Sequence, residues 1–224
     1  MFVFIFYENK YRGVIHNSLQ TKLINCCRYV YYAGGGFCYR VYHHEKTPNK
    51  NWNSMIILLH WLVALVVVGL FALGWWMVDL NYYHAWYKAA PDTHKSIGLI
   101  LFFVLIVRLI LKTLTAAPAP LSSHAKWEKW LAQKTHWLLY LLLFVVMFSG
   151  YMISTADGRA ISIFGVFDIP ATLTSIQNQE DIAGTIHWYG ACVLIGFSLL
   201  HAIGALKHHF IDKDNTLKRM LGKA

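Results

Sequence analysis

Four long apolar stretches restrict the possible folds of this chain more than any other feature of its sequence. They cover residues 54–78, 93–114, 135–153 and 181–206. A helix of about 20 mainly apolar residues crosses the hydrocarbon core of a bilayer, so each stretch is close to the length of a span. Charged residues make up only 14% of the chain, against roughly 25% in ordinary soluble domains. The pattern predicts an all-α integral membrane protein, a bundle of four transmembrane helices.

The basic residues predict how this bundle is oriented. The loops after the first and third spans hold one basic residue each, Lys88 and Arg159. The remaining basic residues near the spans lie after the second span or in the C-terminal tail: Lys126, Lys129, Lys134, Lys207, Lys213, Lys218, Arg219 and Lys223. Short basic loops stay in the cytoplasm, so both termini are expected to face inward. The net charge of +9 thus follows topology, and no nucleic-acid partner is expected.

Two segments outside the spans have weaker patterns. Residues 1–51 show no clean period and no signal-peptide order, so we expect a poorly ordered extension or a start assigned too far upstream, followed by one transmembrane domain over 52–224. Residues 121–134 combine lysines with two tryptophans, which predicts an amphipathic approach along the membrane surface. The four cysteines are too few and too irregular for a disulfide framework, and no Cys-x-x-Cys-His motif for covalent haem occurs.

Four histidines lie within or at the edges of the spans, where a polar ring is costly and indicates a functional site. His187 and His201 are fourteen residues apart on one predicted helix, about 21 Å of rise, and therefore share a face. With the predicted topology, His94 lies at the depth of His187, near the outer surface, and His60 at the depth of His201, near the inner surface. Two histidines at matched depth on different helices can clamp a flat iron porphyrin from both sides. Two such pairs predict two haems stacked across the membrane.

Small residues support the same four histidines, because a porphyrin lying against a helix needs room at i+3 or i+4. Such positions hold Ala64, Gly98, Gly190, Ala191, Gly204 and Ala205. His136 is followed at these positions by Leu139 and Tyr140, so a hydrogen bond or a headgroup contact is expected there instead of ligation. A zinc transporter is the alternative metal-binding function, but it would favour carboxylates inside the spans, and the sequence has none there.

Two further basic groups have predicted roles. Arg108 lies fourteen residues after His94 and therefore at the depth of the inner pair. There it is expected either to bind a haem propionate or to extend toward cytoplasmic headgroups. Lys95 and the free N–H groups at the starts of the second and fourth spans are expected near the propionates of the outer haem.

Short segments around the histidines have a recognisable form. They are LHWL at 59–62, THKSIG at 93–98, IHW at 186–188, LHA at 200–202 and KHHFIDKDNTL at 207–217. From about residue 52 to the C-terminus the chain resembles the bacterial cytochrome b561 family of di-haem inner-membrane cytochromes. Segments 70–74 and 149–158 are similar to the branch of cytochrome b561 homologue 2 proteins. Residues 1–51 have no counterpart in this resemblance.

The resemblance implies two non-covalent b haems with the ligand pairs His60/His201 and His94/His187. It also implies electron exchange with quinone near the inner haem, and His208 matches the position of the family's quinone contact. A basic membrane anchor is the simpler role for His208. In one branch of the family superoxide delivers electrons at the outer face and ubiquinone is reduced.

The expected function is an inner-membrane cytochrome that relays electrons between a periplasmic donor and the quinone pool. Two axial histidines leave no open iron position, which suits electron transfer rather than bond chemistry at the metal. The alternatives are a superoxide:ubiquinone oxidoreductase and a haem-bearing membrane anchor subunit of a partner dehydrogenase. Neither the donor, the haem potentials nor the oligomeric state follows from the sequence.

Overall fold

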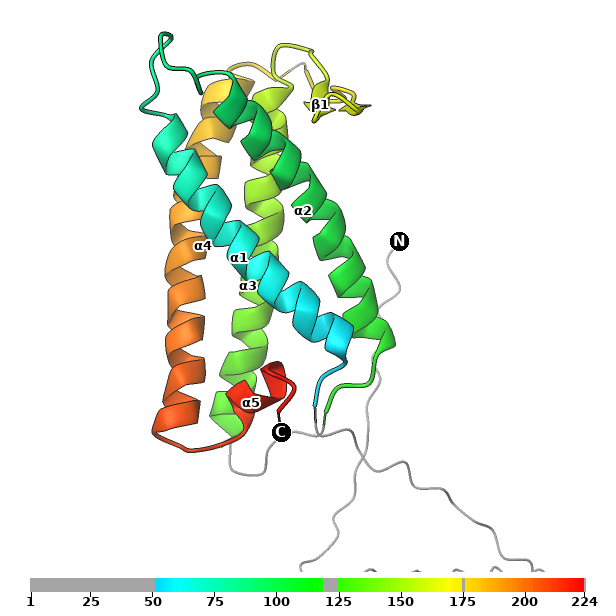
Figure 1. Cartoon of the computed structure of the whole chain (residues 1–224), viewed down its shortest axis with the longest axis vertical. Coiled ribbons are helices and arrows are strands. Elements are labelled where there is room, and N and C mark those ends of the chain that lie inside the picture. Colours follow the sequence, from blue (N-terminus) through cyan, green and yellow to red (C-terminus); the bar gives the residue numbers. More distant parts are fainter. Residues whose placement is uncertain (1–50, 119–124, 175, 224) are drawn as a thin grey trace, which may run out of the picture. The chain divides into compact units, whose positions relative to one another are not determined.

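The computed structural model describes residues 51–118, 125–174 and 176–223. Within them, four helices are long and apolar enough to cross a membrane: α1 (Ser54–Met77), α2 (Ala89–Leu114), α3 (Lys126–Ser154) and α4 (Gln179–Phe210). A short helix, α5 (Thr216–Met220), follows α4. Figure 1 shows the four long helices as one bundle. The predicted all-α membrane bundle is therefore confirmed, whereas the predicted extension at 1–51 lies outside the described residues apart from Asn51.

The long helices pack as two helical hairpins. The most extensive contacts join α3 to α4, and the next most extensive join α1 to α2, while α1 with α4 and α2 with α3 share far fewer. All four helices nevertheless contribute to one buried cluster, formed by Val63, Leu101, Leu105, Tyr140, Leu143 and Leu194. The outward faces carry many exposed large apolar side chains, which suits hydrocarbon rather than water as the surrounding medium.

Two helices begin earlier than the sequence predicts. Helix α2 starts at Ala89, four residues before the predicted span, and includes Pro91 in its first turn. Proline is tolerated in a first turn because the N–H groups there have no partner within the helix. Helix α3 starts at Lys126, so most of the segment 121–134, predicted as a separate amphipathic segment, forms the first turns of this helix. The Glu128 carboxylate accepts a hydrogen bond from the Ala125 N–H at 2.9 Å and stabilises this start.

A β-hairpin that the sequence analysis did not predict lies between α3 and α4. Strands β1 (Ile161–Ile163) and β2 (Phe167–Ile169) pair antiparallel, with Ser162 opposite Asp168. Gly165 takes a φ of 72° in the turn, a conformation that glycine adopts without strain. Ser96 of α2 lies two residues after His94, and its hydroxyl accepts a hydrogen bond from the Phe164 N–H at 3.1 Å. This bond connects the β-hairpin to α2.

The start of α1 and the C-terminal segment lie at the same end of the bundle. The Trp61 indole N–H donates to the Met220 carbonyl at 2.9 Å, and Gly222 lies near the side chain of Ile57. A chain with four spans begins and ends on the same side of the membrane, and this proximity agrees with that. The side of the membrane that this end faces stays a prediction, based on the basic residues.

Candidate haem site

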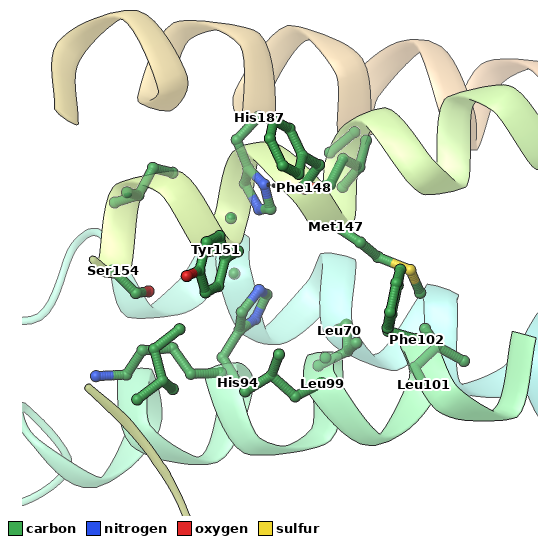
Figure 2. A pocket seen from close by; sticks show the side chains of 18 of the residues that line it. Leu70, His94, Leu99, Leu101, Phe102, Met147, Phe148, Tyr151, Ser154 and His187 are labelled. Atoms are coloured by element: carbon green, nitrogen blue, oxygen red, sulfur yellow. Dashed lines mark hydrogen bonds between the residues drawn. The ribbon is translucent and has the colours of Figure 1, made fainter. Parts of the chain in front are cut away.

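Helices α2 and α4 bring the rings of His94 and His187 opposite each other in the half of the bundle nearer the β-hairpin (Figure 2). Figure 2 shows the two rings pointing toward each other across a cavity. Their ring centres are 6.2 Å apart and their planes are inclined by 70°. The cavity measures about 1090 Å³ and is lined mainly by apolar side chains. Its size reaches the upper end of the range found for cofactor pockets, about 300–1,000 Å³.

The separation of the rings fits two ligands on opposite faces of a haem. A metal–imidazole bond is about 2 Å long and the ring centre lies about 1.1 Å beyond the nitrogen, so two trans imidazoles have centres about 6.3 Å apart. The value for His94 and His187 is 6.2 Å. The pair therefore fits the group that the resemblance implies.

Two glycines make room for these rings. A Cβ on Gly150 of α3 would lie 3.0 Å from His187 Cε1, and one on Gly74 of α1 would lie 3.2 Å from His94 Cε1. Both distances are shorter than the 3.5–4.0 Å of a comfortable carbon–carbon contact. Each histidine ring thus lies in a recess that only glycine provides without displacement. The two glycines belong to α3 and α1, which do not carry the histidines of this pair.

A hydrogen bond sets the tautomer of His187. Its Nδ1 lies 2.8 Å from the Val146 carbonyl, and because a carbonyl can only accept, Nδ1 carries the proton. Nε2 is then left with its lone pair, which is the arrangement in most metal-binding histidines. His94 Nδ1 is buried, and no hydrogen-bond partner for it is found among the described residues.

Cations line the rim of this cavity, where the propionates of a haem would need partners. Lys95 lines it and pairs with Asp92 at 2.8 Å. Arg159, which the sequence analysis did not assign to the site, also lines it and pairs with Asp157. The hydrogen bond from Arg159 lowers the pKa of Asp157 and raises that of Arg159, so both stay charged at neutral pH.

At the other end of the bundle, His60 of α1 faces His201 of α4. Their ring centres are 6.4 Å apart, again close to the separation of two trans imidazoles. Arg108 lies at this depth, as predicted, with a guanidinium nitrogen 3.2 Å from His60 Nδ1 and another hydrogen-bonded to the Tyr140 hydroxyl. Since guanidinium only donates, this contact places the His60 proton on Nε2, and ligation through Nε2 requires Arg108 to turn away.

His136 is closer to the inner pair than its sequence context indicated. Its ring centre is 5.0 Å from that of His201, with the planes inclined by 70°. This separation is more than 1 Å shorter than two trans ligands of one metal need, so the geometry favours His60 as the partner of His201. Position along a helix gives depth but not azimuth, and for that reason the approach of His136 was not predicted.

His208 lies in the last turn of α4, beyond His201. Its Nδ1 is 2.8 Å from an Asp212 carboxylate oxygen and 3.3 Å from one of Asp214. Asp212 also accepts from the Lys207 ammonium at 2.9 Å, and this hydrogen bond lowers the pKa of its carboxyl. The quinone contact expected at His208 is not tested by this geometry.

Comparison with known proteins places the chain in a family. Residues 51–223 match the family described as prokaryotic cytochrome b561. The chain is 52% identical to cytochrome b561 homolog 2 of Escherichia coli K12 over 179 residues, which cover 80% of this chain and 95% of that protein. It is 29% identical to E. coli cytochrome b561 homolog 1 over 74% of the chain and 93% of the relative. It is 28% identical to a probable superoxide oxidase, CybB of Yersinia pestis, over 78% of the chain and 98% of that relative.

The family accounts for the histidine-rich bundle, because its members bind haem b in the membrane. The expected family, fold and inner-membrane location are therefore confirmed. The chain belongs to the prokaryotic cytochrome b561 family of multi-pass, haem b-binding electron-transfer proteins of the inner membrane.

Proposed function

We propose that this protein holds two haem b groups and relays electrons across the membrane between a periplasmic donor and the quinone pool. The observation that carries the proposal is the presence of two histidine pairs, His94/His187 and His60/His201, with ring centres 6.2 and 6.4 Å apart. Both pairs use α4, on which His187 and His201 are separated by fourteen residues, or about 21 Å of rise. That separation supports one pair near each side of the bilayer.

When bound, haem b would supply a one-electron carrier, and the four histidines of the two pairs would hold its iron. The chain's own residues then orient and neutralise the group. The Val146 carbonyl fixes the proton of His187 on Nδ1, and Lys95 and Arg159 offer cationic partners at the outer rim. At the inner pair, Arg108 is the cation available for a propionate once it leaves His60.

Quinone, for which ubiquinone is the candidate, is proposed to react near His208, at the end of the bundle that holds the inner pair. Reduction of a quinone takes up two protons with two electrons, and an imidazole beside carboxylates is suited to deliver protons. Surrounding lipid gives the quinone access to this end of the helices.

A second function is favoured by the relative described as a probable superoxide oxidase. In such a reaction two superoxide ions are oxidised to dioxygen while their two electrons, with two protons, convert one quinone to quinol. The purified protein would reduce ubiquinone when superoxide is generated in solution, and no reduction without an added partner would reject this second function.

Haem stoichiometry tests the main proposal. The haem-to-protein ratio and the reduced-minus-oxidised spectra are measured for the wild-type protein and for His→Ala variants at the four positions. We expect two b haems, with His94→Ala and His187→Ala losing one and the same component. His60→Ala and His201→Ala should lose the other.

His136→Ala is the matched control, because His136 also lies against His201 but at 5.0 Å. It should retain both haems. Loss of the inner component in His136→Ala together with its retention in His60→Ala would show that the proposed inner pair is wrong.

A further inference from the structure

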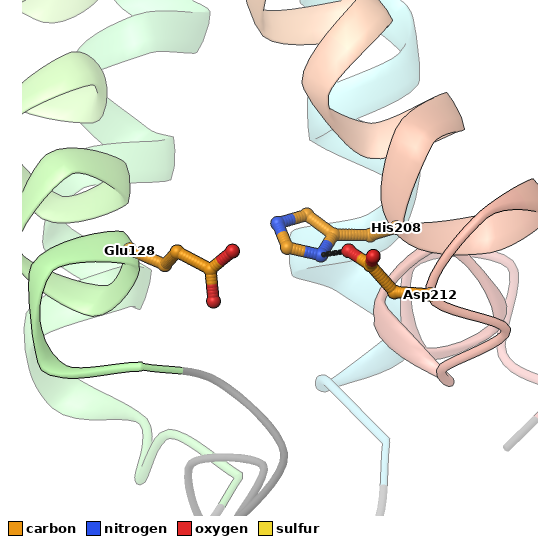
Figure 3. A group of neighbouring side chains, drawn as sticks. All are labelled: Glu128, His208 and Asp212. Carbon is orange, nitrogen blue, oxygen red and sulfur yellow. Dashed lines mark ion pairs between the residues drawn. The ribbon is translucent and has the colours of Figure 1, made fainter.

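A cluster of three potential metal ligands lies away from both histidine pairs. One ligand atom each from Glu128, His208 and Asp212 fall within 4.8 Å of one another. Figure 3 shows the three side chains converging from two directions, Glu128 from α3 and the other two from the end of α4 and the residues that follow it. The cluster therefore lies between the start of α3 and the end of α4 (Figure 3).

The arrangement of the three side chains resembles that of a built site rather than a scatter of surface charges. His208 lies in the last turn of α4 and Asp212 just after the helix ends, and their Nδ1 and Oδ2 atoms are 2.8 Å apart. The side chains of Glu128 and His208 are 17% and 19% exposed, and that of Asp212 is 32% exposed. Glu128 is further held by the hydrogen bond from the Ala125 N–H to its Oε2 atom, which leaves Oε1 directed at the cluster.

A cation already lies between the two carboxylates. The Lys207 ammonium is 3.3 Å from Glu128 Oε1 and 2.9 Å from Asp212 Oδ2. Among the described residues it is the one ammonium paired with both Glu128 and Asp212, so the two negative charges share one positive charge. The side chain of Lys207 is 43% exposed and long enough to move into solvent.

We propose that Glu128, His208 and Asp212 form a binding site for a divalent transition-metal cation of the zinc class. One imidazole and two carboxylates are a ligand set that suits zinc, with a water or a further group in the fourth position. Zinc–ligand bonds of about 2.0–2.2 Å in a tetrahedral site put ligand atoms about 3.3–3.6 Å apart. The ligand atoms of this cluster lie within 4.8 Å of one another, so side-chain rotations have to bring the more distant ones closer. The metal replaces the Lys207 ammonium and joins the start of α3 to the end of α4.

This site does not depend on haem ligation or on quinone chemistry. If quinone does react near His208, a metal on the imidazole would hold its lone pair and slow proton delivery. Inhibition of quinone reduction by zinc would then accompany binding, but the inference is tested by the binding itself.

The test is a zinc titration of the purified, haem-loaded protein without a histidine tag, followed by calorimetry and by elemental analysis after gel filtration. We expect one zinc per chain. Glu128→Gln, Asp212→Asn and His208→Gln should each weaken binding at least tenfold while the haem spectrum stays unchanged. Glu180→Gln and His209→Gln are matched controls, an acidic residue at the other end of α4 and the neighbouring histidine, and both should bind as the wild type does.

Lys207→Met separates a metal site from a simple ion-pair cluster. Because the metal no longer competes with an ammonium, this variant should bind zinc at least as tightly as the wild type. Absence of binding, weaker binding in Lys207→Met, or equal binding in the wild type and the three ligand variants would overturn the proposal. The last outcome would indicate an adventitious ion only.

Discussion

Gly150→Ala is the sharpest available probe of the proposed outer haem site. The new Cβ would lie 3.0 Å from Cε1 and 3.2 Å from Nδ1 of His187. A comfortable contact begins at about 3.5 Å, so the ring has to retreat by roughly 0.5 Å. It is held in place by the 2.8 Å hydrogen bond from Nδ1 to the Val146 carbonyl, which such a retreat would stretch.

The cost is expected at the ligand rather than in the helix. Overpacking typically costs about 1–3 kcal/mol, and because each 1.4 kcal/mol is tenfold, haem affinity at this pair should fall about 5- to 140-fold. Alanine also favours a helix interior over glycine by about 1 kcal/mol, so thermal stability of the haem-free protein should not fall in parallel. Loss of one haem from an intact bundle is therefore the signature.

The assay measures the rate at which haem leaves the protein for an excess of a haem-accepting protein, with the two spectral components followed separately. In Gly150→Ala the outer component should leave faster and the inner one at the wild-type rate. Gly69→Ala is the control, because a Cβ at that helical glycine meets no atom within 4 Å. If both variants lost haem at the wild-type rate, the recess at Gly150 would have no part in binding.

Three further changes test neighbouring features. In Gly98→Ala the new Cβ meets no protein atom within 4 Å although Gly98 lines the cavity, so a change in the outer haem spectrum would report contact with the porphyrin itself. Arg108→Gln should shift the midpoint potential of the inner haem downward, because a nearby positive charge stabilises the electron-rich state, while the outer potential measured in the same redox titration stays constant. Ser96→Ala removes the acceptor of the Phe164 N–H and should destabilise the β-hairpin by about 1–3 kcal/mol, seen as faster proteolysis between α3 and α4.

The spans could be predicted because hydrocarbon imposes a length and a composition on any helix that crosses it. Their ends were less predictable. The lysines and tryptophans at the start of α3 suggested a separate surface segment, yet one continuous helix accommodates them where it leaves the hydrocarbon. Pro91 precedes the predicted second span, yet its position in a first turn lets the helix begin before it.

The candidate site was predictable in depth but not in rotation about each helix axis. A rise of 1.5 Å per residue gives the level of His94, His187, His60 and His201, and the structure brings these residues together in the expected pairs. Contacts between helices also depend on how each helix is rotated about its own axis, and this rotation cannot be read from a single sequence. The recess at Gly150 and the approach of Glu128 to His208 depend on this rotation, so the sequence does not predict them. The alternation of apolar and polar residues on both sides of Gly165, by contrast, is a pattern typical of a β-hairpin.

The division of the bundle into two helical hairpins gives the cofactors a structural role as well. Each proposed ligand pair takes one histidine from the α1–α2 hairpin and one from α4, where direct contacts between the hairpins are few. With this ligation, each iron would join the two helical hairpins, whose direct helix–helix contacts are few. Haem binding would then stabilise the packed bundle by mass action, in addition to the buried apolar cluster that all four helices share.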